Sequence, residues 1–74
     1  MHNCNLKPVN SALIKQVGYN PMTSVLCVEF RDGSVYHYSG VPSSVYEGMM
    51  LSSSMGHYFD TYVKKAGYSY TRER

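Results

Sequence analysis

The sequence VLCVEFRDGSVYHY, residues 25–38, decides the fold. It contains two runs rich in β-branched and aromatic residues, and the dipeptide Asp32-Gly33 separates them. Two such runs around an Asp-Gly turn are typical of a β-hairpin. Because side chains alternate between the faces of a strand, the pairing of the two arms decides where Tyr36 and Tyr38 point.

Two turns fit this hairpin, and their registers differ by one residue. A two-residue type I′ loop places Val28 opposite His37 and brings the imidazole onto the apolar face. A three-residue loop with a left-handed Gly33 places Val28 opposite Tyr36. We favour the second turn because burying an imidazole without a partner costs about 1–3 kcal/mol. It also collects the apolar side chains on one face: Leu26, Val28, Phe30, Tyr36 and Tyr38.

A further strand is expected before the hairpin, within residues 10–19. Leu13, Val17 and Tyr19 alternate onto one side of this segment, and Lys15 interrupts them. This pattern indicates an edge strand or a strand that contains a bulge. Residues 1–9 show no periodic pattern, so we expect a loosely ordered N-terminal arm followed by one domain over residues 10–74.

Two short helices are expected after the hairpin. Pro42 suits the first turn of the first helix, and Ser54 is a candidate N-cap for the second. Gly67 is placed to end the second helix. Residues 68–71 alternate and are expected to dock as an extended segment, with residues 72–74 as a tail. The second helix has an apolar stripe: Met55, Phe59, Tyr62 and Val63.

The predicted fold class is therefore α+β. A three-stranded antiparallel meander is followed by two short helices that pack on one face of the sheet, in a single small domain.

The composition limits the functional classes. The chain has 74 residues, a net charge of +2, eight tyrosines and no tryptophan. A core of this size is marginal alone, so we expect a homo-oligomer. The spacing of Cys4 and Cys27 matches no zinc site, so we expect no metal or cofactor. The three histidines are not part of a catalytic pattern, so we expect no enzymatic activity; the alternative is a metal-independent nuclease. Without a membrane span or signal peptide, we expect a cytoplasmic protein and no membrane partner.

Several residues along the chain match one known pattern: Ser11, Val17-Gly18-Tyr19, Leu26, Val28, Phe30, Gly33, Tyr36, Tyr38, Val41-Pro42, Val45-Tyr46, Ser54, Gly56, Tyr58-Phe59, Tyr68, Tyr70 and Arg72. With them the chain resembles a KTSC domain, a short module seen alone in bacterial and phage proteins and at the C-terminus of some lysyl-tRNA synthetases. The resemblance implies RNA binding through that attachment, and a free-standing copy implies a phage or prophage origin.

Candidate binding residues gather near the C-terminal end, where cations alternate with tyrosines as phosphate contact and base stacking require. The alternative is a solvated helix end with docked tyrosines. The start of the second helix is a candidate anion site, and the alternative there is a simple serine cap. These primary candidates are Lys64, Lys65, Arg72, Tyr68, Tyr70, Ser54, Gly56 and His57.

Secondary candidates lie on or next to the hairpin. Tyr36 and Tyr38 form a possible stacking platform for bases, although the favoured register makes them core rings. His37 and Arg31 are the other two, with a plain exposed histidine as the alternative for His37.

We expect a non-enzymatic binding module for an anionic ligand, which is RNA or a small nucleotide. One form of this hypothesis is a phage-type protein whose oligomer sequesters a host nucleotide signal. The alternative is a protein-interaction or assembly module with a tyrosine-rich interface and no nucleotide ligand.

Overall fold

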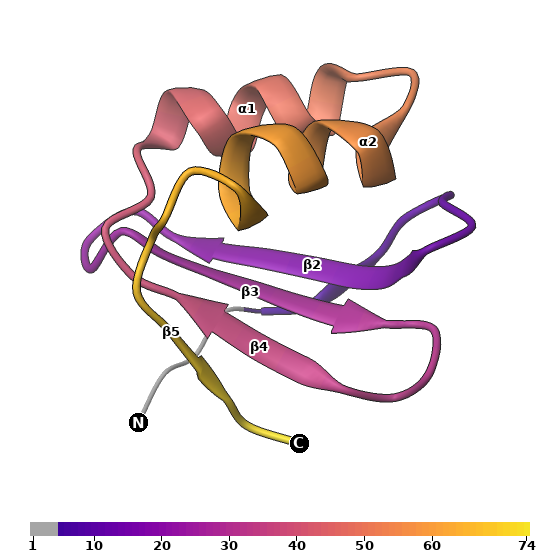
Figure 1. The fold of residues 1–74 in the computed structure, drawn as a ribbon, viewed down its shortest axis with the longest axis horizontal. Helices are drawn as coiled ribbons and strands as arrows, with labels where there is room; N and C mark the ends of the chain where they lie inside the picture. Colours follow the sequence, from indigo (N-terminus) through magenta and orange to yellow (C-terminus); the bar gives the residue numbers. More distant parts are fainter. Residues whose placement is uncertain (1–4) are drawn as a thin grey trace.

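The computed structural model describes residues 5–74, which form one antiparallel sheet with the helices on one of its faces (Figure 1). The sheet has five strands, and their order in space follows their order along the chain. The strands are β1 (Lys7–Pro8), β2 (Ile14–Asn20), β3 (Val25–Phe30), β4 (Val35–Tyr38) and β5 (Tyr70–Arg72). The helices are α1 (Ser43–Leu51) and α2 (Met55–Phe59), and α2 continues into a π-helical turn, η1 (Asp60–Lys64). The predicted α+β class is confirmed.

The hairpin takes the register of the three-residue turn. β3 and β4 pair Val28 with Tyr36, and Leu26 with Tyr38. The amide of Gly33 donates to the carbonyl oxygen of Phe30 at 3.0 Å, and the φ angle of Gly33 is +91°. Glycine adopts this left-handed conformation without strain. The favoured register is confirmed, and it turns His37 to the face of the sheet opposite the helices.

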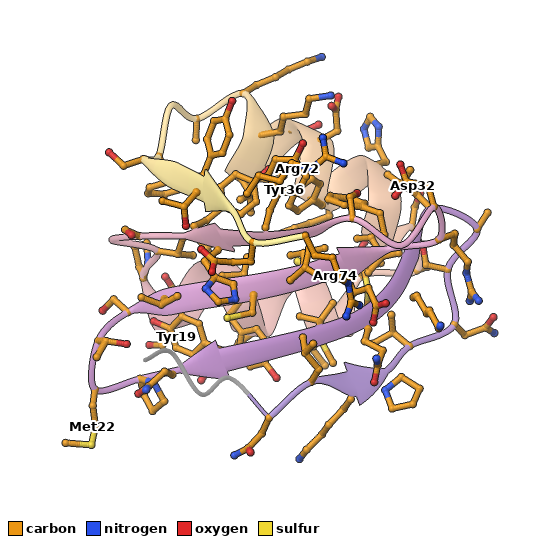
Figure 2. The ribbon with its side chains drawn as sticks, turned by 90° about the horizontal axis from the view of Figure 1, so that it is seen from below. Tyr19, Met22, Asp32, Tyr36, Arg72 and Arg74 are labelled. Carbon is orange, nitrogen blue, oxygen red and sulfur yellow. The ribbon has the colours of Figure 1, made fainter. Side chains whose placement is uncertain are left out.

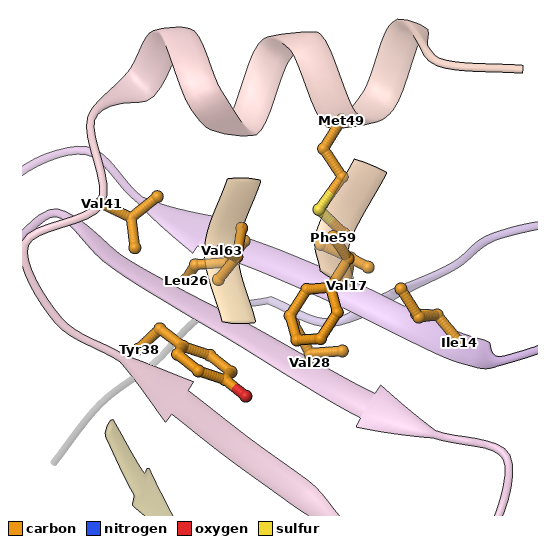
Figure 3. Close-up of a cluster of buried hydrophobic side chains, with 9 residues drawn as sticks. All are labelled: Ile14, Val17, Leu26, Val28, Tyr38, Val41, Met49, Phe59 and Val63. Atoms are coloured by element: carbon orange, nitrogen blue, oxygen red, sulfur yellow. The ribbon is translucent and has the colours of Figure 1, made fainter. Parts of the chain in front are cut away.

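The core lies between the sheet and the helices (Figure 3). The Tyr19 ring stacks on Tyr46 at 4.8 Å and its hydroxyl donates to the Val41 carbonyl at 2.6 Å, which ties β2 to α1. Tyr38 is the only core tyrosine that is buried, whereas Tyr36 packs against the cluster half-buried. The buried side chains of this cluster are Ile14, Val17, Leu26, Val28, Tyr38, Val41, Met49, Phe59 and Val63.

β2 contains the irregularity that Lys15 indicated. The pairing with β3 shifts between Ile14 and Gln16, so Lys15 is an extra residue in β2. The bulge lets Ile14 and Val17 both face the core, where both are buried. Leu13 was predicted for that side and is instead 48% exposed.

The sheet is wider at its N-terminal edge than the predicted three-stranded meander. Lys7 and Pro8, from the segment predicted as a loosely ordered arm, pair with Val17 and Gln16. The rest of that prediction falls partly on residues 1–4, which lie outside the described residues. A two-residue strand has too few positions for an alternating pattern, so the sequence contains no signal for it.

The C-terminal end of the chain forms the opposite edge. Residues 70–72 pair with β4, and the backbone of Val35 bonds with that of Glu73 and Arg74 at 2.7–3.3 Å. The prediction of an extended segment after the helices therefore holds, but the prediction of a tail at residues 72–74 is wrong. Pairing with these residues satisfies the backbone donors and acceptors of β4 that would otherwise form an open sheet edge.

The second helix widens halfway along. The amide of Lys65 donates to the carbonyl oxygen of Asp60 at 3.0 Å, five residues earlier, as a π-helical turn requires. Phe59 and Val63 remain buried, but Tyr62, predicted for the same stripe, is 53% exposed. Gly67 follows the helix with a φ angle of +88°, in agreement with its predicted role at the helix end.

The two helices approach each other closely at Gly48. A methyl group added at Gly48 would lie 2.8 Å from Cζ of Tyr58 and would overlap its hydroxyl oxygen. Glycine is required here for the space it leaves, because the Tyr58 ring crosses α1 at this position.

We therefore predict that Gly48→Ala destabilises the protein. Alanine favours a helix over glycine by about 1 kcal/mol, but overpacking a fixed ring typically costs about 1–3 kcal/mol. The urea midpoint should fall. Gly56→Ala is the matched control, because its methyl would meet Leu13 Cβ at 3.4 Å, an ordinary contact distance. A Gly48→Ala variant that is as stable as Gly56→Ala would show that the contact with Tyr58 is not restrictive.

Candidate functional site

A groove opens between the β3–β4 hairpin, β5 and the helical segment α2–η1. Its volume is about 710 Å³. Five aromatic rings line it: Phe30, Tyr36, Tyr38, Phe59 and Tyr70. The remaining lining residues are Ala12, Leu13, Arg31, Asp32, Ser34, Asp60 and Lys64. The groove therefore combines an aromatic wall with charges of both signs.

The aromatic rings contact one another and form a continuous surface. The Tyr70 ring lies 5.6 Å from Tyr36 and 5.4 Å from Tyr38, between ring centroids. Phe59 meets Tyr38 edge to face at 5.5 Å. Burial raises the pKa of Tyr38 to about 12. Tyr38 is 6% exposed and Tyr70 is 59% exposed, so the outer ring of this pair is that of Tyr70 and the inner ring is that of Tyr38.

The cations of the groove come from three elements. The guanidinium carbon of Arg72 lies 5.9 Å from the centroid of the Tyr36 ring, within the range of a cation–π contact. Figure 2 shows the two side chains together, with Asp32 at the hairpin turn. Lys64 is exposed on η1. Arg31 follows β3, and its Nε donates to the carbonyl oxygen of Ser11 at 3.0 Å.

Each of the two carboxylates has a local partner. Asp32 Oδ1 accepts hydrogen bonds from the amide of Ser34 at 2.9 Å and from its hydroxyl at 2.6 Å. These bonds hold the pKa of Asp32 below its usual value. Asp60 Oδ2 pairs with Lys65 Nζ at 3.2 Å. Asp32 is thereby fixed in the hairpin turn, whereas the partner of Asp60 is an exposed lysine.

The strand that carries Tyr70 and Arg72 is fastened from the opposite face of the sheet. Arg74 Nη2 donates to Glu29 Oε2 at 2.9 Å, and Gln16 Nε2 donates to Glu29 Oε1 at 2.6 Å. The Glu29 side chain is only 6% exposed, so its carboxylate depends on these two donors. The bond from Gln16, with the charges of Lys15 and Arg74, outweighs burial and lowers the pKa of Glu29.

The structure brings about half of the predicted site residues to one place. Three primary candidates are at or beside the groove: Lys64 and Tyr70 line it, and Arg72 lies over Tyr36. The secondary candidates Arg31, Tyr36 and Tyr38 also line it. Tyr36 and Tyr38 therefore belong both to the core cluster and to the groove.

Other candidates have different surroundings. Lys65 is directed to Asp60, and Tyr68 is half-buried against the core. His37 lies on the far face of the sheet, where its Nδ1 is 3.8 Å from Glu73 Oε2.

The start of α2 does not contribute to the groove lining among residues 5–74. Ser54 occupies the N-cap position without a side-chain hydrogen bond to the helix. Gly56 faces Leu13 and Ser11, so its small size serves the packing of α2 against the segment before β2. His57 is exposed. None of the three residues of the candidate anion site predicted here lines the groove.

Seven residues that line the groove are not among the site residues predicted from the sequence: Ala12, Leu13, Phe30, Asp32, Ser34, Phe59 and Asp60. The sequence places Phe30 and Phe59 in the core and Asp32 in the hairpin turn, and it does not predict a site role for Asp60. One signal was available: Asp60 precedes Lys64 by four residues, so the two share a helix face.

Residues 5–74 contain no cluster of three histidine, cysteine, aspartate or glutamate side chains that could hold a metal ion. In the same part of the chain, no helix has the length and apolar character needed to cross a membrane.

The model of the KTSC domain family matches residues 10–68. The chain belongs to the KTSC domain family. It is 33% identical over 64 residues to an uncharacterized protein of Stutzerimonas stutzeri, across 86% of this chain and 90% of that protein. The crystal structure of a KTSC domain protein from Yersinia pestis superposes with a TM-score of 0.87 at 32% identity, covering 97% of this chain and all of that one. The resemblance seen in the sequence is confirmed.

The KTSC domain also occurs within a larger enzyme. This chain is 44% identical over 59 residues to a lysine–tRNA ligase of Nostoc punctiforme, which covers 80% of this chain and 10% of the ligase. The chain therefore corresponds to a small part of that ligase.

We predict that Glu29→Gln loosens the C-terminal strand and lowers stability at neutral pH, because the buried pair with Arg74 loses its charge. The pKa of Glu29 lies below its ordinary value of 4.5 in the folded state. Its contribution to stability is therefore complete above that value and disappears as the pH falls through the lower folded-state pKa. Urea midpoints at several pH values should show wild type and variant differing at pH 7 and converging in acid.

Glu47→Gln is the matched control, since Glu47 is exposed on α1. A difference between wild type and Glu29→Gln that persists unchanged in acid would rule out the charge of Glu29 as the cause.

Proposed function

We propose that the groove binds the nucleotide unit of an anionic ligand, single-stranded RNA or a small nucleotide, and that it does so without catalysing a reaction. The observation that carries this proposal is the exposed Tyr70 ring, which stands next to the Arg72–Tyr36 pair and Lys64 around one groove. The volume of about 710 Å³ falls within the range of about 300–1,000 Å³ that is usual for small-molecule sites.

Stacking supplies the attraction for the base. A nucleobase laid on an exposed aromatic side chain gains about 1–3 kcal/mol, and the gain depends little on which base it is. Tyr70 presents the most exposed ring of the groove, and Tyr36 and Tyr38 hold that ring from behind. A rigid support reduces the entropy lost when the base binds.

Cations beside the stacking surface supply the attraction for phosphate. Arg72 and Lys64 are exposed, and neither forms a salt bridge within residues 5–74. Lys65, by contrast, is already paired with Asp60. We therefore assign phosphate contacts to Arg72 and Lys64 and not to Lys65.

The relatives add one supporting fact. The matching part of the Nostoc punctiforme protein lies within a lysine–tRNA ligase, an enzyme whose name states that it acts on tRNA. An RNA-binding role for the module would fit that setting, although the domain there is only a tenth of the enzyme.

A KTSC domain that is not part of a larger enzyme could use nucleotide binding in a second way. We propose that it assembles into a homo-oligomer, and that a phage-encoded copy uses it to hold a host nucleotide signal in the cytoplasm. Exposed apolar side chains on the helical layer offer a surface for assembly: Met50 (38%), Leu51 (87%) and Tyr62 (53%).

The same three side chains favour the alternative function, a protein-interaction module with no nucleotide ligand. The two functions differ in their dependence on salt. Phosphate contacts weaken steeply as salt is added, and an apolar protein interface does not.

We predict that the double variant Lys64→Ala, Arg72→Ala loses at least about tenfold in affinity for a labelled single-stranded RNA, measured by fluorescence anisotropy. Each lost phosphate contact should also flatten the plot of log K against log salt by about 0.7. The matched control is Lys7→Ala, Lys15→Ala, which removes the same charge from β1 and β2, where neither lysine lines the groove. Equal binding by both double variants, or wild-type binding that ignores salt, would refute the phosphate assignment.

A further inference from the structure

Two carboxylates line the groove that we propose for a nucleotide. Asp32 follows β3, and Asp60 begins η1. A site for phosphate alone would be weakened by them, because like charges repel in a partly enclosed space. The two carboxylates therefore favour a ligand part that donates hydrogen bonds over a second phosphate.

Asp60 is the better placed of the two to read such a donor. Asp32 already uses Oδ1 for two bonds to Ser34, and these bonds shape the hairpin turn. Asp60 uses Oδ2 for Lys65, whose side chain is 72% exposed. Ion pairs this exposed contribute about 0–1 kcal/mol and exchange readily with other partners. In the part of the chain that the structure describes, Asp60 Oδ1 accepts no hydrogen bond.

The donor edge of the ligand selects among the bases. An ionised carboxylate accepts two hydrogen bonds from donors that lie side by side. Guanine presents such a pair on its Watson–Crick edge, the N1–H and the N2 amino group. Adenine and cytosine present one amino group beside a ring nitrogen that accepts, and uracil presents one N–H between two carbonyls. Each of these three would set an acceptor against the carboxylate.

We propose that the groove selects guanine and that Asp60 reads its Watson–Crick edge. The ring would stack on Tyr70, and the phosphate would lie toward Arg72 and Lys64. This inference rests on the nucleotide binding proposed above. Guanine nucleotides carry both the donors and the anion, so one ligand satisfies the acids and the cations of the groove.

The charges around Asp60 agree with this arrangement. Lys64 lies four residues after Asp60 in the same helical segment, and both line the groove. The Asp60 carboxylate would contact the base, and the Lys64 ammonium would contact the phosphate. The carboxylate is then kept away from the negative phosphate.

The test is isothermal titration of the full chain with 5′-GMP, 5′-IMP and 5′-AMP. IMP keeps the N1–H of guanine and lacks the amino group. The expected order of affinity is GMP, then IMP, then AMP, with GMP about tenfold or more tighter than AMP, as a bidentate contact gives. Asp60→Asn should reduce that ratio to about threefold or less, because the amide replaces one acceptor with a donor.

Lys65→Ala is the matched control, since it removes the ion pair and leaves the carboxylate; it should keep the preference for GMP. Two short single-stranded RNAs that differ only in one central base, guanine or adenine, form a second arm. A preference seen only in the RNA arm supports the inference with RNA as the source of the guanine.

Equal affinity for GMP and AMP, with equal affinity for the two RNAs, overturns the selection of guanine and leaves nucleotide binding intact. A preference that survives in Asp60→Asn overturns the role of Asp60. No binding of any nucleotide or RNA overturns the proposed function itself.

Discussion

The left-handed Gly33 controls the arrangement on which the rest of the structure depends. Its conformation allows the three-residue turn, and the turn sets the pairing of Val28 with Tyr36. Because side chains alternate along a strand, this register places Tyr36 and Tyr38 on the helical side of the sheet. A shift of the register by one residue would turn Tyr36 and Tyr38 to the opposite face and bring His37 to the helical side. The groove would then lose the tyrosines of β4 from its aromatic wall.

The same register passes to the C-terminal strand. β4 serves as the template for β5 and pairs Tyr36 with Arg72 and Tyr38 with Tyr70. Tyr70 therefore lines the groove, and Arg72 lies over Tyr36, because the hairpin has this register. On the opposite face, Arg74 reaches the buried Glu29 and holds β5 in place. A ligand that requires docked β5 would stabilise this edge by linkage, by a free energy that grows with the logarithm of the ratio of ligand concentration to Kd.

The register is predictable from local signals, and the family is predictable from residues spread along most of the chain. Asp32-Gly33 marks the turn, and the cost of burying His37 separates the two registers. The interleaved cations and tyrosines near the C-terminus likewise pointed to Lys64, Tyr70 and Arg72.

What the sequence did not reveal depends on contacts between distant segments. The edge strand β1 and the pairing of residues 72–74 with β4 depend on backbone groups, which have no residue-specific signal. Gly56 belongs to a candidate anion site by its position before His57, yet its space is taken by the packing of Leu13. The helical segment also widens into a π-helical turn at Asp60–Lys64, and an apolar periodicity of 3.6 residues does not foresee that change.

The most direct measurement is a titration of the ¹⁵N-labelled protein with GMP, followed by the amide chemical shifts. The account predicts that the shifts change around Tyr36, Asp60, Lys64, Tyr70 and Arg72, and that the amides of β1 stay in place. Changes centred on Met50, Leu51 and Tyr62, or no changes at ligand concentrations in the millimolar range, would contradict a nucleotide site in this groove.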